Sequence, residues 1–175
     1  KYNGKQVILP TDCFTYATWY NQVIFDKAGV PYPAYNQSYS WEELLDVAKR
    51  CTMDRSGDGA IDTWGLSLYT PVWHIVQPWY NSTGARVVSP DGKKASGYVD
   101  SPEFVDFLTK YRDLMGKYGV ARPLNMPPDG DSWVETWTNG FLNGNCAMLV
   151  GAPWTVNEAD RMEEQSPEKF RWATT

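Results

Sequence analysis

"SYSWEELLDVAKRCTMDRSGDGAIDTWGLSLY", residues 38–69, places a helix signal, a turn-rich loop and a strand signal in immediate succession. Ser40 and Glu43 have the spacing of a capping box, in which the two side chains satisfy the first free N–H groups of a helix. The next apolar residues have the i, i+3, i+4, i+7 spacing of a helix packed on a core: Trp41, Leu44, Leu45 and Ala48. We therefore expect a helix over 38–51 and, after the loop, a strand over 63–69.

The loop Asp54–Gly65 has the oxygen spacing of an EF-hand calcium loop. Counted from its first aspartate, oxygen-bearing groups stand at alternate positions, with Gly59 at the sharp turn; they are Asp54, Ser56, Asp58, the carbonyl of Ala60, and Asp62. Gly65 stands where the bidentate glutamate belongs, and a strand signal comes next instead of a helix signal. The loop is a candidate structural Ca²⁺ site with a reduced ligand set. The alternative is an Asp/Gly turn that hydrogen-bonds to itself.

The rest of the chain alternates between strand and helix signals. Strands are expected over 4–10 and 146–150, and a hairpin over 85–99 that turns on Pro90-Asp91-Gly92. Helices are expected over 15–29, 71–84 (with an irregular end at Pro78), 100–119, 133–144 and 153–165. The buried stripe of the 100–119 helix is expected to be Phe104, Leu108, Tyr111 and Leu114/Met115. This order indicates the α/β class.

The composition and charge of the chain exclude several classes of binding partner. The chain has 175 residues, 42% of them hydrophobic and 21% charged, which fits one globular domain. A net charge of −5 without a Lys/Arg cluster argues against nucleic acid or an anionic membrane surface as partner, so the expected ligand is neutral or weakly charged. The longest apolar stretch, "CAMLVGAPW", is far shorter than the roughly 18 residues of a membrane span, so none is expected.

Catalytic machinery is not visible in the sequence. The single histidine, His74, stands among aromatic residues, and there is no HxxH or GxSxG pattern. Cys13, Cys51 and Cys146 are widely spaced and are expected to be buried thiols. We therefore expect a protein that is not an enzyme.

Four segments, taken in chain order, resemble one family: "WYNQVIFDKAGVPYP", "SWEELLDVAKRCTMDRSGDGAIDTWGLSL", "PWYNSTGARVVSPDGKKASGYVDSPEFVDFLTKYRDLMGKYG" and "FLNGNCAMLVGAPWTV". They resemble the family-1 extracellular solute-binding proteins, the maltose-binding-protein-like receptors that deliver sugars to bacterial ABC importers. The resemblance implies a lobe of the periplasmic-binding-protein-like (type II) fold, with helices packed on a small mixed sheet. It also implies no organic cofactor.

The same resemblance implies that 1–175 is one domain, essentially the second (C-terminal) lobe of a two-lobed receptor, with hinge strands near 5–10 and 170–175. The implied partners are a sugar, the missing first lobe of the same receptor and an ABC permease. The implied location is extracellular or periplasmic, with a lipid anchor as an option through an N-terminus that this chain lacks.

Aromatic residues are the first candidates for ligand contact, because flat rings cover the apolar C–H faces of pyranose rings. Trp154 lies just after the 146–150 strand, at the carboxyl edge where α/β folds bind ligands. "GAPW" also resembles a family segment whose tryptophan stacks on sugar. Trp73 and Tyr80 resemble cleft aromatics of the family, although the turn "NSTG" after Tyr80 departs from the family pattern. Core packing is the alternative for each ring.

Polar contacts are expected just beyond the first hinge. Phe14 stands where a family member has an acidic sugar contact, and a phenyl ring cannot accept a hydrogen bond. Either the substrate differs or Thr11 or Asp12 supplies the polar contact. Two alternatives to a sugar receptor remain open: a glycosidase-like enzyme domain and a receptor lobe for another solute.

Overall fold

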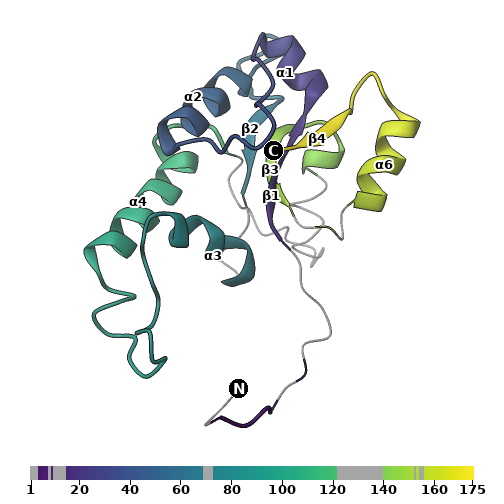
Figure 1. Cartoon of the computed structure of the whole chain (residues 1–175). Coiled ribbons are helices and arrows are strands. Elements are labelled where there is room, and N and C mark those ends of the chain that lie inside the picture. The colour runs from purple at the N-terminus through teal and green to yellow at the C-terminus, as the bar shows by residue number, and fades with distance from the viewer. Residues whose placement is uncertain are drawn as a thin grey trace, which may run out of the picture.

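The computed structural model describes the chain except for residues 1–3, 8, 10–14, 69–72, 122–139, 152, 154 and 155, and it describes only the backbone of 73–75. A four-stranded mixed sheet of order β2-β3-β1-β4 forms the centre. Helices α1 to α4 lie on one side of it and α6 on the other (Figure 1). Two clusters of buried side chains, one on each face, form the core.

The N-terminal part of the expected 15–29 helix is a strand. β1 spans Ala17–Asn21 and α1 spans Gln22–Ala28, so the helix prediction was wrong for the first half. β1 pairs antiparallel with β3 on one side and with β4 on the other. A segment in the middle of the sheet satisfies its backbone groups through both neighbours, and this overrides the helix signal. Gly29 ends α1 with a φ of 62°, as the stop signal predicted.

The segment 38–69 folds as expected where it is described. α2 spans Trp41–Cys51 and begins with the capping box of Ser40 and Glu43, both of whose hydrogen bonds form. Ala48 is fully buried, and the rest of the predicted stripe packs against the core. β2 spans Trp64–Ser67 and pairs parallel with β3.

α3 (Trp73–Ser82) and α4 (Pro102–Gly116) pack on the same core. α3 continues through Pro78, so the irregular end expected there is not found. In α4 the side chain of Leu108 is 43% exposed, whereas Phe107 is buried; the predicted stripe was wrong at that position. Phe104, Tyr111 and Leu114 are buried as predicted.

Two expected β elements do not form in the described residues. Between α3 and α4 the chain makes turns, with Gly92 N–H donating to the Ser89 carbonyl, and no strand lies within residues 85–100. The turn of the expected hairpin is therefore present without its ladder. Of the segment 4–10, residues 4–7 and 9 are described; they form only an isolated bridge at Lys5, and Val7 and Leu9 are exposed.

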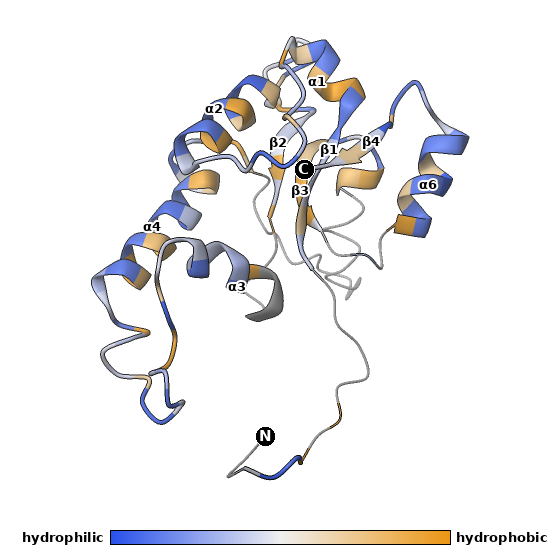
Figure 2. Ribbon diagram, viewed as in Figure 1, coloured by the Kyte–Doolittle hydropathy of each residue, from blue (hydrophilic) through white to orange (hydrophobic). Residues whose placement is uncertain are grey.

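The C-terminal third completes the sheet. β3 spans Cys146–Gly151, α6 spans Val156–Gln165 and β4 spans Trp172–Thr174. Trp19 and Trp172 stack with ring centroids 4.7 Å apart. Figure 2 shows the apolar residues gathered on the strands and on the inner sides of the helices.

Candidate functional site

The strand ends meet at one edge of the sheet. β2, β3 and β4 run in the same direction and finish there, whereas the antiparallel β1 starts there, with Ala17 opposite Gly151. In α/β folds the carboxyl ends of strands are the place where ligands bind. We call this the strand-end edge, defined by Ser67, Gly151, Thr174 and Ala17.

A cavity of about 500 Å³ opens beside the strand-end edge. The sheet contributes the start of β1, the end of β3, and Thr175 just beyond β4; α2 and α3 contribute aromatic rings. The rings and hydroxyl-bearing residues that line it are Tyr16, Thr18, Ser38, Tyr39, Ser40, Trp41, Trp79, Ser82, Thr83 and Thr175. Trp41 and Trp79 meet edge to face, with centroids 6.2 Å apart.

The chemistry of this cavity suits a neutral solute. Several hydroxyls are already donors inside the lobe: Ser82 to the Trp79 carbonyl (2.7 Å) and Thr175 to the Gln37 carbonyl (2.6 Å). Their lone pairs can still accept hydrogen bonds from solute hydroxyls. Lys110 is the one formally charged side chain of the described lining, and Asp106 pairs with it at 2.9 Å.

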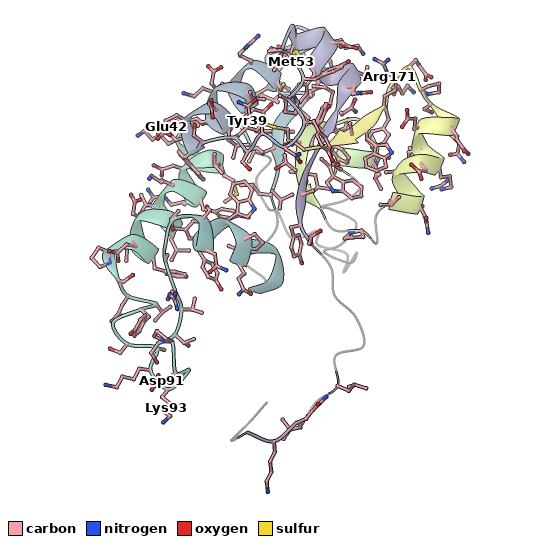
Figure 3. The ribbon with its side chains drawn as sticks, in the orientation of Figure 1. Tyr39, Glu42, Met53, Asp91, Lys93 and Arg171 are labelled. Carbon is pink, nitrogen blue, oxygen red and sulfur yellow. The ribbon has the colours of Figure 1, made fainter. Side chains whose placement is uncertain are left out.

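Tyr39 is held as a neutral phenol in this cavity. Burial raises the pKa of its hydroxyl to about 12, because the phenolate would lose hydration. The O–H group is therefore a hydrogen-bond donor throughout the physiological pH range. Figure 3 shows Tyr39 beside α2.

Most of the predicted ligand residues fall outside the described part of the chain. These are Thr11, Asp12, Phe14 and Trp154. Trp73 starts α3, but its side chain is also outside it. In sequence, Phe14 stands three residues before Ala17 and Trp154 three residues after Gly151, so each adjoins a strand terminus of the strand-end edge.

Tyr80 is placed in the core. Its side chain is 4% exposed, and its ring packs edge to face on Phe104 (5.4 Å) and Phe107 (6.0 Å). Burial raises the pKa of its hydroxyl. A ring in this position leaves little surface for a ligand.

The sequence did not single out Trp79, and it assigned Trp41 only to a packing stripe. Both line the cavity because α3 packs across the start of α2. The available signal was the neighbouring pair Trp79-Tyr80 on one helix: adjacent helical residues point about 100° apart, so one ring can face the core while the other faces elsewhere. The packing of the two helices places the Trp79 ring at the cavity and the Tyr80 ring in the core.

The carboxylates of the Asp54–Gly65 loop bind the backbone of the loop itself. Asp54 accepts hydrogen bonds from the N–H groups of Gly57 (2.6 Å) and Gly59 (2.8 Å). Asp62 accepts from Arg55 and Ser56, each at 2.7 Å. These bonds, led by those of Gly59 and Ser56 respectively, lower the pKa of both carboxyls.

The candidate calcium site gains no support. Asp58 accepts from the Ala60 N–H, and Ser56 and Ala60 are exposed. The described residues contain no group of three or more His, Cys, Asp or Glu side chains that could hold a metal ion. The self-bonded Asp/Gly turn, the alternative interpretation, describes the loop as it is found.

Gly65, the last residue of the loop, is glycine because of packing. A Cβ there would lie 2.1 Å from the Ala48 carbonyl oxygen, so the close approach of α2 and β2 requires glycine.

Two further sequence expectations concern reactive side chains. Cys51 is a fully buried thiol, and burial raises its pKa to about 12, which makes it unreactive in the folded lobe. Cys146 is also buried, and Cys13 lies outside the described residues. His74 is part of α3, and nothing of its side chain is described.

The sequence matches the bacterial extracellular solute-binding proteins over residues 1–171. The chain belongs to this family. Among its relatives, the putative ABC transporter periplasmic-binding protein YcjN of Escherichia coli is 26% identical over an alignment of 160 residues that covers 87% of this chain and 32% of YcjN. A putative binding protein of Brucella abortus is 26% identical over 166 residues, 94% of this chain and 36% of that protein. The chain therefore spans about a third of the length of these relatives.

Solved structures agree on the fold. An ABC substrate-binding protein of Listeria monocytogenes, in complex with cycloalternan, superimposes with a TM-score of 0.72 at 26% identity, over 100% of this chain and 40% of that one. A maltose/maltodextrin-binding domain of Bdellovibrio bacteriovorus, bound to maltotriose, gives 0.66 at 20% identity over 93% of this chain and 36% of that one. The predicted fold, a single α/β lobe of the solute-binding-protein type, is confirmed.

The members of this family are bacterial extracellular solute-binding proteins, and YcjN is named as a periplasmic-binding protein of an ABC transporter. Solute-binding proteins are not enzymes and carry no organic cofactor. The glycosidase-like alternative is therefore not favoured. Within the described residues no helix has both the length and the apolar character needed to cross a membrane.

Proposed function

We propose that this chain is the second lobe of an extracellular sugar receptor that delivers a mono- or oligosaccharide to the permease of an ABC importer. The observation that carries the proposal is the match to the family together with a neighbour at 26% identity that was solved in complex with cycloalternan. The hinges are proposed near 5–10 and 170–175, and the first lobe and the permease are proposed partners.

The sugar is proposed to lie along the strand-end edge. Trp154 and Trp73 would cover the C–H faces of the pyranose rings, and Thr11 or Asp12 would bind hydroxyls, with Phe14 narrowing the site. The cavity beside the edge supports a neutral ligand, because its lining combines aromatic rings and hydroxyls with one paired charge. Tyr80 would not touch the sugar; its ring would hold α3 in place by packing on Phe104 in the core.

A panel of sugars tests the proposal on the complete receptor. Titration with mono- and oligosaccharides is expected to change tryptophan emission saturably for at least one sugar, because indole emission responds to the polarity around the ring. Trp154→Ala is expected to weaken that binding by about tenfold or more, the equivalent of about 1.4 kcal/mol for a lost stacked ring.

Trp64→Phe is the matched control. Trp64 begins β2 opposite Cys146, at the end of the sheet away from the strand-end edge, so its replacement by another ring should leave sugar affinity unchanged. If no sugar produces a response, while a polyol or peptide does, the receptor binds a solute of another class and the sugar proposal fails.

A further inference from the structure

A second cavity, of about 470 Å³, lies between the C-terminal half of α3 and the loop after it. Its lining comes from Gln77, Tyr80 and Asn81 of α3 and from residues 84–90. The loop runs away from the sheet (Figure 1). The cavity shares no lining residue with the cavity beside the strand-end edge, so the two are separate. No part of the proposed sugar-binding function uses it.

The rim of this cavity carries three polar side chains with unused hydrogen-bonding capacity. Gln77, Asn81 and Arg86 are exposed, and within the described structure none of the three side chains makes a hydrogen bond or an ion pair. Beneath them lie the buried Tyr80 and Ala85. The site thus combines an apolar floor with one guanidinium and two carboxamides whose donors are unused.

The loop that carries Arg86 is held by its own hydrogen bonds. The Ser89 hydroxyl binds the Asp91 carboxylate and accepts from the N–H groups of Lys93 (3.1 Å) and Lys94 (3.0 Å). The Ser89 N–H donates to the Lys94 carbonyl at 2.7 Å. On the other side, Thr83 and Gly84 close the end of α3 by bonds to the carbonyls of Tyr80 and Asn81. The walls of the cavity are therefore organised before any ligand arrives.

The local charge is positive in a chain whose net charge is −5. Arg86, Lys93 and Lys94 stand on this loop, and the one acidic side chain between them, Asp91, is engaged by Ser89 and by the Lys93 N–H. Figure 3 shows Asp91 and Lys93 at the tip of the loop. The hydroxyl of Ser89 lowers the pKa of Asp91, which keeps that carboxylate ionised and bound in the turn.

We propose that this pocket binds a carboxylate group, with Arg86 as its ionic partner and the carboxamides of Gln77 and Asn81 as further donors. The planar guanidinium fork matches the two oxygens of a carboxylate, and carboxamide N–H groups donate to the same oxygens. Val87, which is half-buried, and the exposed Val88 contact the apolar part of the ligand. The carboxylate is that of a free organic acid or that of a glutamate or aspartate side chain of another protein.

Nuclear magnetic resonance observes the side-chain N–H groups of these three residues directly. The ¹⁵N-labelled chain is titrated with sodium acetate, and with sodium chloride at matched ionic strength as the reference. In a second arm the probe is a short peptide with one glutamate and blocked ends. We expect the side-chain N–H resonances of Gln77, Asn81 and Arg86 to shift saturably with acetate and not with chloride.

Variants separate a pocket from general charge attraction. Arg86→Gln is expected to weaken acetate binding by about tenfold or more, since it removes the charge and the fork. Lys93→Gln, a change of the same charge on the same loop but outside the lining, is expected to leave the affinity within about twofold. Affinity for the peptide well above that for acetate assigns the carboxylate to a protein partner, and equal affinities assign it to a free acid.

Three outcomes overturn the proposal: shifts that chloride reproduces, shifts that persist in Arg86→Gln, or equal losses in Arg86→Gln and Lys93→Gln. The backbone spectrum reports whether each variant is folded, and Arg86 is exposed, so loss of the fold would be seen separately. Because the sugar panel uses a different site and a different readout, failure here leaves the proposed function standing, and the reverse also holds.

Discussion

Asn21 joins three parts of the lobe through one carboxamide. Its side-chain oxygen accepts from the N–H groups of Val23 (2.9 Å) and Ile24 (3.4 Å), which caps α1 directly after β1. Its Nδ2 donates to the Lys169 carbonyl at 3.2 Å, in the segment that leads to β4. The residue is fully buried, so each of these groups depends on it for hydrogen bonding.

Asn21→Ala is expected to lower the free energy of unfolding by about 2–3 kcal/mol, the sum of a lost helix cap and an unsatisfied buried acceptor. Urea denaturation monitored by circular dichroism measures it. Asn157→Ala, which changes an exposed asparagine on α6, is the control and should stay within about 0.5 kcal/mol. Equal losses in the two variants would contradict this role for Asn21.

Asp54 gives a second prediction at this scale. Its carboxylate organises the loop by binding backbone N–H groups, so thermal melts in calcium and in chelator should superimpose. Asp54→Ala should lower the melting temperature equally in both conditions. A rise in melting temperature with calcium that Asp54→Ala abolishes would restore the calcium interpretation.

The same carboxylate gives the loop a dependence on pH. The hydrogen bond from Gly59 lowers the pKa of Asp54 in the folded lobe below its ordinary value. The stabilisation is therefore present above the unfolded pKa, about 4, and is lost as the pH falls through the folded value. Asp54→Asn should therefore lose less stability than the parent chain over that fall in pH, and thermal melts of both proteins at several acidic pH values measure the difference.

At the scale of elements, α2 and β2 approach each other so closely that one glycine limits the contact. A Cβ at position 65 would lie 2.1 Å from the Ala48 oxygen and 2.5 Å from its Cα, both backbone atoms that cannot rotate away. Gly65→Ala is expected to cost about 3 kcal/mol of stability or more, by forcing the helix off the sheet. Gly116→Ala, where nothing lies within 4 Å, is the control. A Gly65→Ala chain as stable as the parent would refute this packing.

A local sequence pattern is sufficient to predict some of the helices and strands but not others. The capping box and stripe of α2 and the stop at Gly29 were read correctly because the interactions lie within a few residues. The 15–21 segment was misread as helix. Trp19 and Tyr20 belong to the central strand only because β3 and β4, more than a hundred residues away, supply its hydrogen bonds. No local signal carries that information.

At the scale of the whole molecule, the proposed receptor predicts a large difference between this lobe and the complete protein. The chain covers 40% of the Listeria neighbour, and a sugar held between two lobes draws its contacts from both. We expect the 175-residue chain to bind the receptor's sugar at least about a hundredfold more weakly, the equivalent of about 3 kcal/mol. Calorimetry on both proteins measures this, and equal affinities would place the whole site in this lobe.

The sequence by itself determined the α/β class, the family and most helices, because periodicity, caps and ordered segments of resemblance are local properties that survive without a partner. It also placed Trp154 directly after the strand that is β3, because chain order alone decides which residues follow a predicted strand. The tertiary structure decided the roles of Tyr80, Trp79 and the aspartate loop. Folding decides how far a ring is exposed, which group a carboxylate binds and where only glycine fits. Each of these depends on atoms from distant parts of the chain, so a local sequence pattern does not predict them.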